Sequence, residues 1–189
     1  CDAFAAAHRD QPSLCGFEQV LPSYMGRLFE REYVVISELM DQPQRPCVFV
    51  LGGAKVGDAF LMMDSVLSRG SADKVLTGGL VANILLAAKS EKIGQGSWDF
   101  IRHSGNEQYI DSARNLLTKY ADRILLPHSL AFLEEGKRRE SPLIHLPDDA
   151  VTLDIGSNDA MRYADIIMKA KTVFVNGPMG VFEEAEIEL

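Results

Sequence analysis

The fold is decided by the stretch Val48-Phe49-Val50-Leu51-Gly52-Gly53-Ala54-Lys55-Val56-Gly57-Asp58-Ala59-Phe60. Its apolar, β-branched start is typical of a buried parallel strand. Two glycines end that strand, and apolar residues then recur at helical spacing, which predicts a helix with one buried face. A strand, a glycine turn and a helix in this order place backbone N–H groups and a helix N-terminus at the carboxyl edge of a sheet, where anions bind.

Lys55 adds a mobile positive charge to this turn, so the stretch indicates phosphate binding. The alternative is that Gly52-Gly53 only punctuates the chain and that Lys55 is an ordinary solvated lysine. The turn is neither a Gly-x-x-x-x-Gly-Lys-Ser/Thr loop nor a Gly-x-Gly-x-x-Gly loop. The motif alone therefore leaves both interpretations open.

Two further stretches repeat the pattern. Residues 74–77 form an apolar run that ends in Gly78-Gly79 before an apolar helical segment, and residues 172–176 lead into Gly177-Pro178-Met179-Gly180. Backbone amides from Met179 to Phe182 are predicted to point at a bound phosphate. Strands that alternate with helices predict an α/β domain with a mostly parallel sheet, in which the glycine turns share one edge.

The other elements are predicted from periodicity and from turn residues. In chain order they are a helix from Ser23 to Met40 with Ser23 as its N-cap, a helix from Phe60 to Arg69, a helix over 80–89, a loop at 94–98, a helix over 106–120 and a strand over 123–127. After these come an exposed excursion with a short edge strand over 128–150, a short apolar segment over 151–156 that ends in a glycine, a helix from 157 to about 170 and a helix over 181–189.

Composition narrows the class of protein. The 189 residues are 47% hydrophobic and carry a net charge of −8, so binding to nucleic acid or to an anionic membrane is not expected. The three cysteines are far apart, which fits a reducing cytoplasm and predicts no disulfide framework. His128 and His145 lack ligand spacing, so no protein-bound metal is expected within the chain. Because the chain starts at Cys1 and stops inside a predicted helix, we expect a fragment of a longer protein.

The chain resembles phosphoglycerate kinase over essentially its whole length. The motifs that carry the resemblance are Asp2-Ala3-Phe4 with His8-Arg9, Leu51-Gly52-Gly53-Ala54-Lys55-Val56, Gly78-Gly79, Leu126-Pro127, Asp154-Ile155-Gly156 and Asn176-Gly177-Pro178-Met179-Gly180-Val181-Phe182-Glu183. The resemblance implies part of a two-lobed enzyme whose nucleotide-binding lobe is a three-layer α/β/α, Rossmann-like domain. Residues 1–17 would end the phosphoglycerate-binding lobe, 18–45 would be the interlobe helix and linker, and 46–189 would be an incomplete nucleotide-binding lobe.

The implied activity is glycolytic. A cytoplasmic kinase, monomeric or weakly dimeric, would transfer a phosphoryl group reversibly between 1,3-bisphosphoglycerate and ADP to give 3-phosphoglycerate and ATP. Mg²⁺ would arrive with the nucleotide, and its protein ligand would lie outside these residues. The missing parts would leave the isolated chain inactive.

The resemblance also implies roles by position. Arg9, Lys55 and Gly180 are the expected catalytic groups, and His8 and Arg9 would bind phosphoglycerate, although Arg9 paired with Asp10 on the surface is the plain alternative. The expected nucleotide-binding residues are Gly53, Lys55, Gly78, Gly79, Trp98, Leu153, Asn176, Pro178, Gly180, Val181 and Glu183. Within this set Leu153 and Trp98 would line the adenine pocket, although Trp98 could instead pack in the core. Glu183 would accept hydrogen bonds from the ribose hydroxyls.

Some positions depart from the family pattern. Ala59 stands where the family usually has a second lysine, four residues after Lys55. Thr77 stands where a third glycine is common, and Ser157 and Asp159 replace the usual Pro and Thr after Asp-Ile-Gly. The first change puts one transition-state charge in doubt.

Two other classes of function compete with the kinase. The chain would be a Rossmann-like module that binds a nucleotide without catalysis, or an α/β domain with incidental glycines and no nucleotide. A coupled enzyme assay distinguishes the kinase from a module that binds a nucleotide without catalysis. Calorimetry with added nucleotide distinguishes either of these from a domain that binds no nucleotide.

Overall fold

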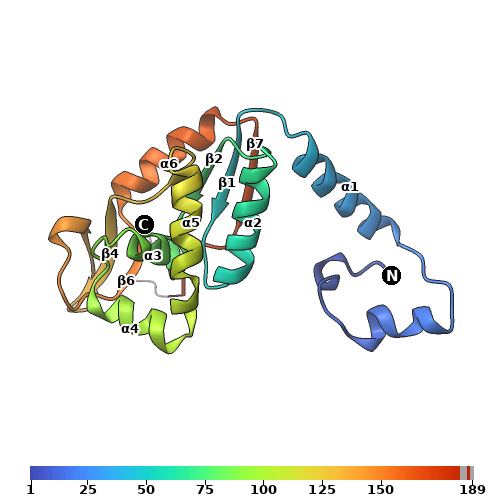
Figure 1. Cartoon of the computed structure of the whole chain (residues 1–189), viewed down its shortest axis with the longest axis horizontal. Helices are drawn as coiled ribbons and strands as arrows, with labels where there is room; N and C mark the ends of the chain where they lie inside the picture. Colours follow the sequence, from blue (N-terminus) through green and yellow to red (C-terminus); the bar gives the residue numbers. More distant parts are fainter. Residues whose placement is uncertain (184–186, 188–189) are drawn as a thin grey trace. The chain divides into compact units, whose positions relative to one another are not determined.

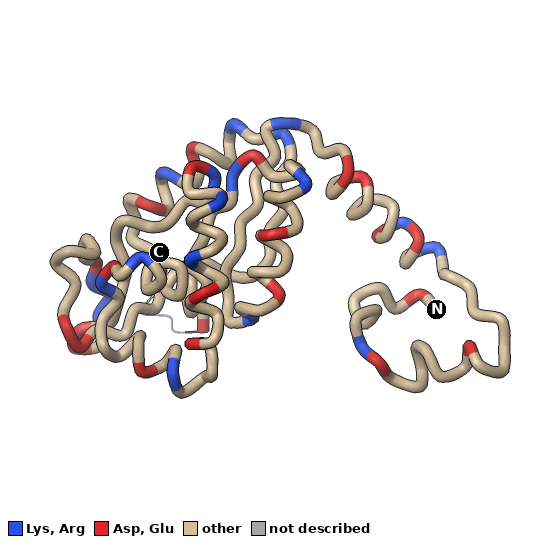
Figure 2. Tube along the Cα trace, viewed as in Figure 1, with Lys and Arg blue, Asp and Glu red and all other residues tan. Residues whose placement is uncertain are grey.

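The computed structural model describes residues 1–183 and Ile187, in two compact units, Cys1–Pro43 and Gln44–Leu189 (Figure 1). In the second unit, acidic and basic residues are interspersed along the trace (Figure 2). None of the described helices is long and apolar enough to cross a membrane.

The first unit holds three short helical turns and one long helix. They are η1 (Phe4–Ala6), η2 (Pro12–Gly16), η3 (Phe17–Gln19) and α1 (Arg27–Asp41). The predicted start of α1 at Ser23 is wrong, because the chain becomes helical only after Gly26. The cap comes from elsewhere: the Asp2 carboxylate accepts a hydrogen bond of 2.8 Å from the Phe29 amide, in the first turn of the helix.

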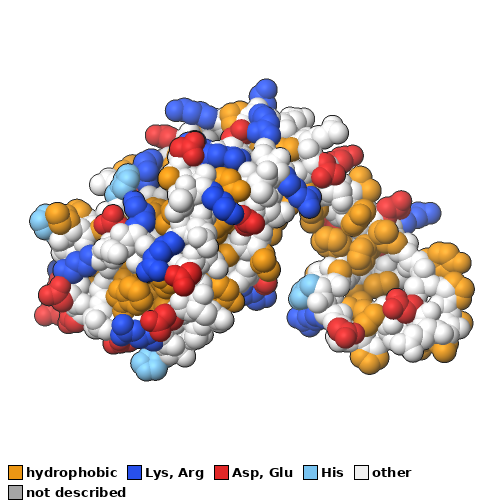
Figure 3. All heavy atoms as spheres, in the orientation of Figure 1, with side chains coloured by type: hydrophobic (Ala, Val, Ile, Leu, Met, Phe, Trp, Pro, Cys, Tyr) orange, Lys and Arg blue, Asp and Glu red, His pale blue; other side chains and the backbone are white. Residues whose placement is uncertain are grey.

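The apolar side chains of α1 find little cover within their own unit. None of its residues is buried, and Figure 3 shows hydrophobic side chains gathered on the surface of the first unit. Leu28, Tyr33 and Val35 are each more than half exposed. Phe29 is the exception in having an aromatic partner, Phe4, whose ring centroid is 5.3 Å away.

A parallel sheet forms the centre of the second unit. Its strand order is β3-β2-β1-β7, with every described pair parallel. The strands are β1 (Cys47–Leu51), β2 (Lys74–Thr77), β3 (Ile124–Leu125) and β7 (Thr172–Asn176). All five residues of β1 are buried, as its apolar run predicts for a central strand covered on both faces. The predicted third strand is shorter than 123–127.

Helices cover both faces of this sheet and complete the predicted three layers (Figure 1). The helices of this unit are α2 (Val56–Ser68), α3 (Gly79–Ala88), α4 (Gln95–His103), η4 (Asn106–Tyr109), α5 (Ile110–Tyr120) and α6 (Ser157–Lys169), of which α6 covers one face of the sheet and α2 and α5 lie on the other side. On the α6 side, Val48, Val50 and Leu76 pack against Tyr163. Strand side chains alternate between faces, so Phe49 faces the opposite layer of helices.

A second, antiparallel sheet of order β5-β4-β6 adjoins the first. It is made of β4 (Ser129–Glu134), β5 (Lys137–Pro142) and β6 (Thr152–Ile155), with η5 (Leu143–His145) after the hairpin. The predicted excursion over 128–150 therefore contains a β-hairpin, β4–β5, in place of a single short edge strand. The apolar segment predicted at 151–156 forms β6, which pairs with β4 and not with the parallel sheet. The predicted loop at 94–98 is also wrong, because α4 begins at Gln95.

The predicted helix over 181–189 lies largely outside the described residues, and its described start at 181–183 is not helical.

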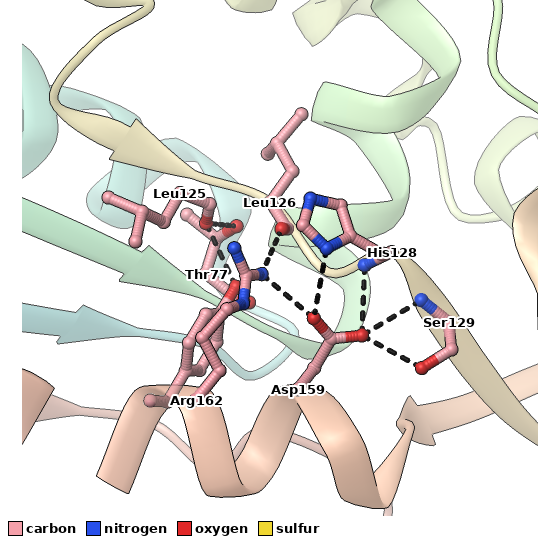
Figure 4. A network of polar contacts seen from close by, with 8 residues as sticks. Thr77, Leu125, Leu126, His128, Ser129, Asp159 and Arg162 are labelled. Carbon is pink, nitrogen blue, oxygen red and sulfur yellow. Dashed lines mark hydrogen bonds and ion pairs between the residues drawn. The ribbon is translucent and has the colours of Figure 1, made fainter. Parts of the chain in front are cut away.

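Helix α6 fastens the two sheets together through its polar side chains (Figure 4). The carboxylate of Asp159, 3% exposed, accepts hydrogen bonds from the Ser129 amide and hydroxyl, both at 2.8 Å, and from the His128 amide at 2.9 Å. Arg162 donates to the same carboxylate at 2.8 Å. Burial of a carboxylate is costly unless donors surround it, and these hydrogen bonds offset that cost.

Tyr163 joins α6 to the parallel sheet. Its hydroxyl lies 3.1 Å from the Thr77 carbonyl and 3.0 Å from the Leu125 carbonyl, at the ends of β2 and β3. Burial raises the pKa of the Tyr163 phenol above its ordinary value. The neutral phenol is thus the form that the fold requires.

We predict that Tyr163→Phe lowers the free energy of unfolding by about 1–2 kcal/mol at pH 7, because the hydroxyl no longer donates to the strand ends. The pKa of Tyr163 is about 10 in the unfolded chain and higher in the folded one. Tyr163 therefore contributes its full stabilisation below about pH 10, and this contribution to the free energy of unfolding falls as the pH rises further. Urea denaturation from pH 7 to 11 should therefore show a steeper alkaline loss in the parent chain than in the variant. Tyr33→Phe, at a half-exposed site, is the control, and equal alkaline slopes for parent and Tyr163→Phe would contradict the assignment.

Candidate functional site

The three glycine turns meet at the carboxyl edge of the parallel sheet. The Gly52 amide donates to the Asn176 carbonyl at 3.0 Å, and the Gly53 amide donates to the Pro178 carbonyl at 2.8 Å. Gly78 lies against Met179, so close that an added Cβ would be 2.6 Å from its sulfur. The prediction that these turns share one edge is confirmed.

The approach of these backbones requires glycine. A Cβ on Gly52 would lie 2.0 Å from the Pro178 carbonyl oxygen, and one on Gly177 would lie 2.5 Å from the Gly52 oxygen. Gly53, Gly79 and Gly177 also have positive φ values of 77°, 54° and 86°. Only glycine adopts this region without strain, so both packing and backbone conformation account for the glycine pairs.

Two helix N-termini open onto this edge. Helix α2 begins after Lys55 and α3 begins after Gly78, and neither start has a side-chain cap among the described residues. The first amides of a helix have no partner within it and carry partial positive charge. Together with Lys55, which is exposed beside them, they form an edge suited to the oxygens of a phosphate.

The turn after β7 is also tied to β6. The Val181 amide donates to the Leu153 carbonyl at 2.8 Å, which brings two predicted nucleotide-binding residues together. This hydrogen bond corrects one expectation: the Val181 amide is occupied and cannot be one of the amides that point at a phosphate.

Gly180 lies in a tighter place than the sequence suggested. An added Cβ would be 2.4 Å from the carboxylate of Asp154, which belongs to β6. Packing against Asp154 is therefore sufficient to require glycine here. A catalytic role for Gly180 stays a prediction.

Trp98 lies on α4 and not in a loop. The hydroxyl of its neighbour Ser97 accepts a hydrogen bond of 2.8 Å from the Thr152 amide. Trp98 and Leu153 are the residues that come next in the chain after this hydrogen-bonded pair. The guanidinium of Arg102 lies 5.5 Å from the centre of the Trp98 ring. The indole thus lies against Arg102 of its own helix, and its contact with an adenine stays a prediction.

Position 59, where the resemblance leads us to expect a second lysine, lies in the core. Ala59 is 1% exposed and belongs to the buried face of α2. A lysine stem at this point of the helix would have to leave the core to reach the edge of the sheet. Lys55 is therefore the lysine at the start of α2 that is placed to meet a phosphate.

The remaining predicted residues are exposed. His8 and Arg9 lie in the first unit, just after η1, and Glu183 lies in the turn that ends the continuously described chain. Their roles toward phosphoglycerate and ribose stay predictions. In the described part of the chain, no group of three or more His, Cys, Asp or Glu residues is arranged to hold a metal ion.

A separate cavity of about 530 Å³ lies at the β3 edge, lined in part by Leu125, Pro127 and Arg162. The Lys and Arg side chains on its wall have acidic partners: Arg162 pairs with Asp159, Arg114 with Asp111 and Lys89 with Glu91. This cavity shares no lining residue with the glycine turns, so it is not the phosphate site.

Sequence reasoning assigned no role to Asp154 and Arg138, which pack behind the turn after β7. Their carboxylate and guanidinium lie 3.1 Å apart, and each side chain is 13% exposed. An arginine within a run of charged residues is predicted to be exposed. Only the position of Asp154 in the Asp-Ile-Gly motif could therefore have indicated this ion pair from the sequence. The fold defines the class, a Rossmann-like α/β domain whose glycine turns meet at the carboxyl edge of a parallel sheet.

Comparison with known proteins names the family. The family described as phosphoglycerate kinase matches residues 1–188. Phosphoglycerate kinase of Methanothermobacter thermautotrophicus is 45% identical over 188 residues, covering 100% of this chain and 46% of that protein. The enzyme of Pyrococcus abyssi is 43% identical over 192 residues, covering 100% and 47%. The chain therefore belongs to the phosphoglycerate kinase family.

Solved structures agree. The crystal structure of phosphoglycerate kinase from Pyrococcus horikoshii matches with a TM-score of 0.91 at 39% identity, covering 98% of this chain and 47% of that one. The structure from Coxiella burnetii matches with a TM-score of 0.79 at 27% identity, covering 96% and 47%. The chain thus spans slightly less than half the length of the relatives it matches.

We predict that Gly52→Ala lowers the free energy of unfolding by about 1–3 kcal/mol, because the new methyl group forces the Pro178 turn away from β1. Ala54→Ser, at an exposed position of the same turn, is the matched control and should change stability by less than about 0.5 kcal/mol. Urea denaturation measures both, and a Gly52→Ala chain as stable as the control would show that the turns do not meet.

Proposed function

We propose that the complete protein to which this chain belongs catalyses reversible transfer of a phosphoryl group between 1,3-bisphosphoglycerate and ADP, giving 3-phosphoglycerate and ATP. The observation that carries the proposal is the meeting of three glycine turns and two uncapped helix starts at one sheet edge, with Lys55 beside them. Phosphoryl transfer needs positioned groups and charge stabilisation more than covalent chemistry by the protein.

Each group then has a task in the nucleotide lobe. The amides at the starts of α2 and α3 would hold phosphate oxygens of the nucleotide, and Lys55 would neutralise the charge that develops during transfer. Leu153, with Trp98, would wall the adenine. Asn176, Pro178 and Val181 would line the phosphates, and Glu183 would accept hydrogen bonds from the ribose.

His8 and Arg9 would act on the other substrate. Arg offers a planar fork of donors that matches a phosphate or a carboxylate, both of which 3-phosphoglycerate carries. Residues 1–17 would accordingly end the phosphoglycerate-binding lobe, 18–45 would connect the lobes, and 46–189 would supply most of the nucleotide-binding lobe.

Mg²⁺ would accompany the nucleotide and neutralise its phosphates. Mg²⁺ held with a nucleotide takes most of its ligands from phosphates and water, and one or two carboxylates suffice on the protein side. We place its protein ligand beyond this chain. We further propose a cytoplasmic enzyme that is a monomer or a weak dimer.

We predict that Lys55→Ala in the complete protein lowers kcat by about 10²–10³-fold, the scale of removing one preorganised electrostatic group. Ala59 leaves no neighbouring lysine to replace it, and Lys55 is exposed, so the melting temperature should stay within about 2 °C. Lys119→Ala, on the exposed side of α5, is the control. A loss below about fivefold in the coupled assay would mean that Lys55 is an ordinary solvated lysine.

For residues 1–189 alone we propose nucleotide binding without catalysis, because the chain spans less than half of its relatives. The coupled assay should detect turnover with the complete protein and none with the purified 189-residue chain, while calorimetry should detect ADP binding to both. Turnover by the isolated chain would contradict this division, and absence of ADP binding to either would contradict the nucleotide site.

A further inference from the structure

Arg138 is a charged residue of the β4–β5 hairpin with an interior position. Its side chain is 13% exposed, whereas that of the adjacent Arg139 is 57% exposed. Burying a guanidinium is costly unless acceptors surround it. The hydrogen-bond acceptors around Arg138 therefore show which segments of the chain this side chain connects.

Each of the three nitrogens of this guanidinium donates to an acceptor, and the acceptors belong to three segments of the chain. Nε donates to Glu140 at 2.9 Å, and Nη2 donates to the Ile155 carbonyl at 2.9 Å. Nη1 donates to the Asp154 carboxylate at 3.1 Å and also to the carbonyl of Ile187. One side chain thus joins β5, the carboxyl end of β6 and the segment that follows the turn after β7.

The contact with Glu140 extends the network to α6. The Glu140 carboxylate accepts from the Ser157 amide at 2.8 Å and from its hydroxyl at 2.6 Å, at the start of the helix. Burial would raise the pKa of Glu140, but the hydrogen bonds from Ser157 and Arg138 outweigh it and lower the pKa below its ordinary value. The anion that faces Arg138 therefore remains charged at neutral pH.

The contacts of Arg138 with Asp154 and Ile187 lie on either side of the predicted nucleotide-binding residues Val181 and Glu183. Asp154 lies directly against Gly180, and the neighbouring Leu153 carbonyl holds the Val181 amide. Ile187, which is 1% exposed, lies four positions beyond Glu183. Arg138 thus grips the chain beside Gly180 and again beyond Glu183.

We propose that Arg138 is a positioning residue for the nucleotide site: through Asp154 and the Ile187 carbonyl it holds residues 180–183 in the conformation that presents Val181 and Glu183 to the ribose and phosphates. The inference rests on the proposed function. It does not place Arg138 in contact with substrate, because the guanidinium is occupied by Asp154, Glu140 and the two carbonyls.

The proposal requires an arginine and not merely a positive charge. A planar guanidinium reaches acceptors in several fixed directions at once, whereas an ammonium is a point charge on a flexible stem. Lysine at this position should keep the attraction to Asp154 while releasing part of the carbonyl contacts, and so should give an intermediate effect.

The test uses the complete protein with Arg138→Met, Arg138→Lys and the matched control Arg139→Met, whose parent residue pairs with Glu134 on the exposed side at 3.3 Å. For Arg138→Met we expect the KM and Kd for ADP to rise about tenfold or more. The KM for 3-phosphoglycerate and kcat should stay within about threefold. Arg138→Lys should lie between this variant and the parent, and Arg139→Met should match the parent.

Hydrogen exchange supplies a readout that needs no nucleotide. In Arg138→Met the contacts of the guanidinium are lost, and exchange of the Val181 amide, which is hydrogen-bonded to the Leu153 carbonyl, should become faster. The amides of β1 should keep their protection. A local change of this kind distinguishes positioning from general loss of stability.

Several results would overturn the inference. They are an unchanged KM for ADP, a parallel rise of both KM values with exchange sped up throughout β1, or restoration of the KM for ADP by adding Asp154→Asn to Arg138→Met, which would trace the effect to an unpaired carboxylate. If Arg138→Met does not fold, Arg138→Lys decides by the same criteria. If the parent protein itself does not bind ADP, the proposed function fails, and the Val181 exchange rate still decides whether Arg138 holds the segment.

Discussion

The second unit depends on one close contact between two backbones, where the end of β1 meets the turn after β7. Gly52 and Gly53 donate to the carbonyls of Asn176 and Pro178, and there is no room for a Cβ at Gly52 or Gly177. This contact brings the end of β7 beside the starts of α2 and α3. The meeting of these turns at one edge, where we propose that phosphates bind, is therefore a consequence of how glycine lets neighbouring strand ends approach.

The second sheet and α6 hold this edge from behind. Buried charges make the connections: Asp159 accepts from the start of β4, and Arg138 ties β5 to the end of β6. Each of these side chains is surrounded by partners of opposite charge or by backbone groups, as burial of a charge demands. The polar networks specify the position of the hairpin, whereas the apolar strands account for the core.

The sequence predicted what is local and missed what is distant. The glycine turns were predictable, since each follows an apolar strand directly. Strand β5 was not, because the run Lys137-Arg138-Arg139-Glu140 has no apolar alternation and the inward position of Arg138 depends on Asp154 and Ile187, far along the chain. The start of α1 was misplaced for the same reason: its cap comes from Asp2 and not from Ser23. The packing of Gly180 against Asp154 likewise joins residues of separate strands.

The most direct test of the phosphate edge is the backbone amide NMR spectrum of the complete protein, recorded with and without ADP. We predict that the largest shift changes fall on Lys55, Gly79 and Gly180, with the β4–β5 hairpin nearly unaffected. Changes concentrated instead around the cavity lined by Leu125 and Pro127, with the glycine turns unmoved, would contradict the account.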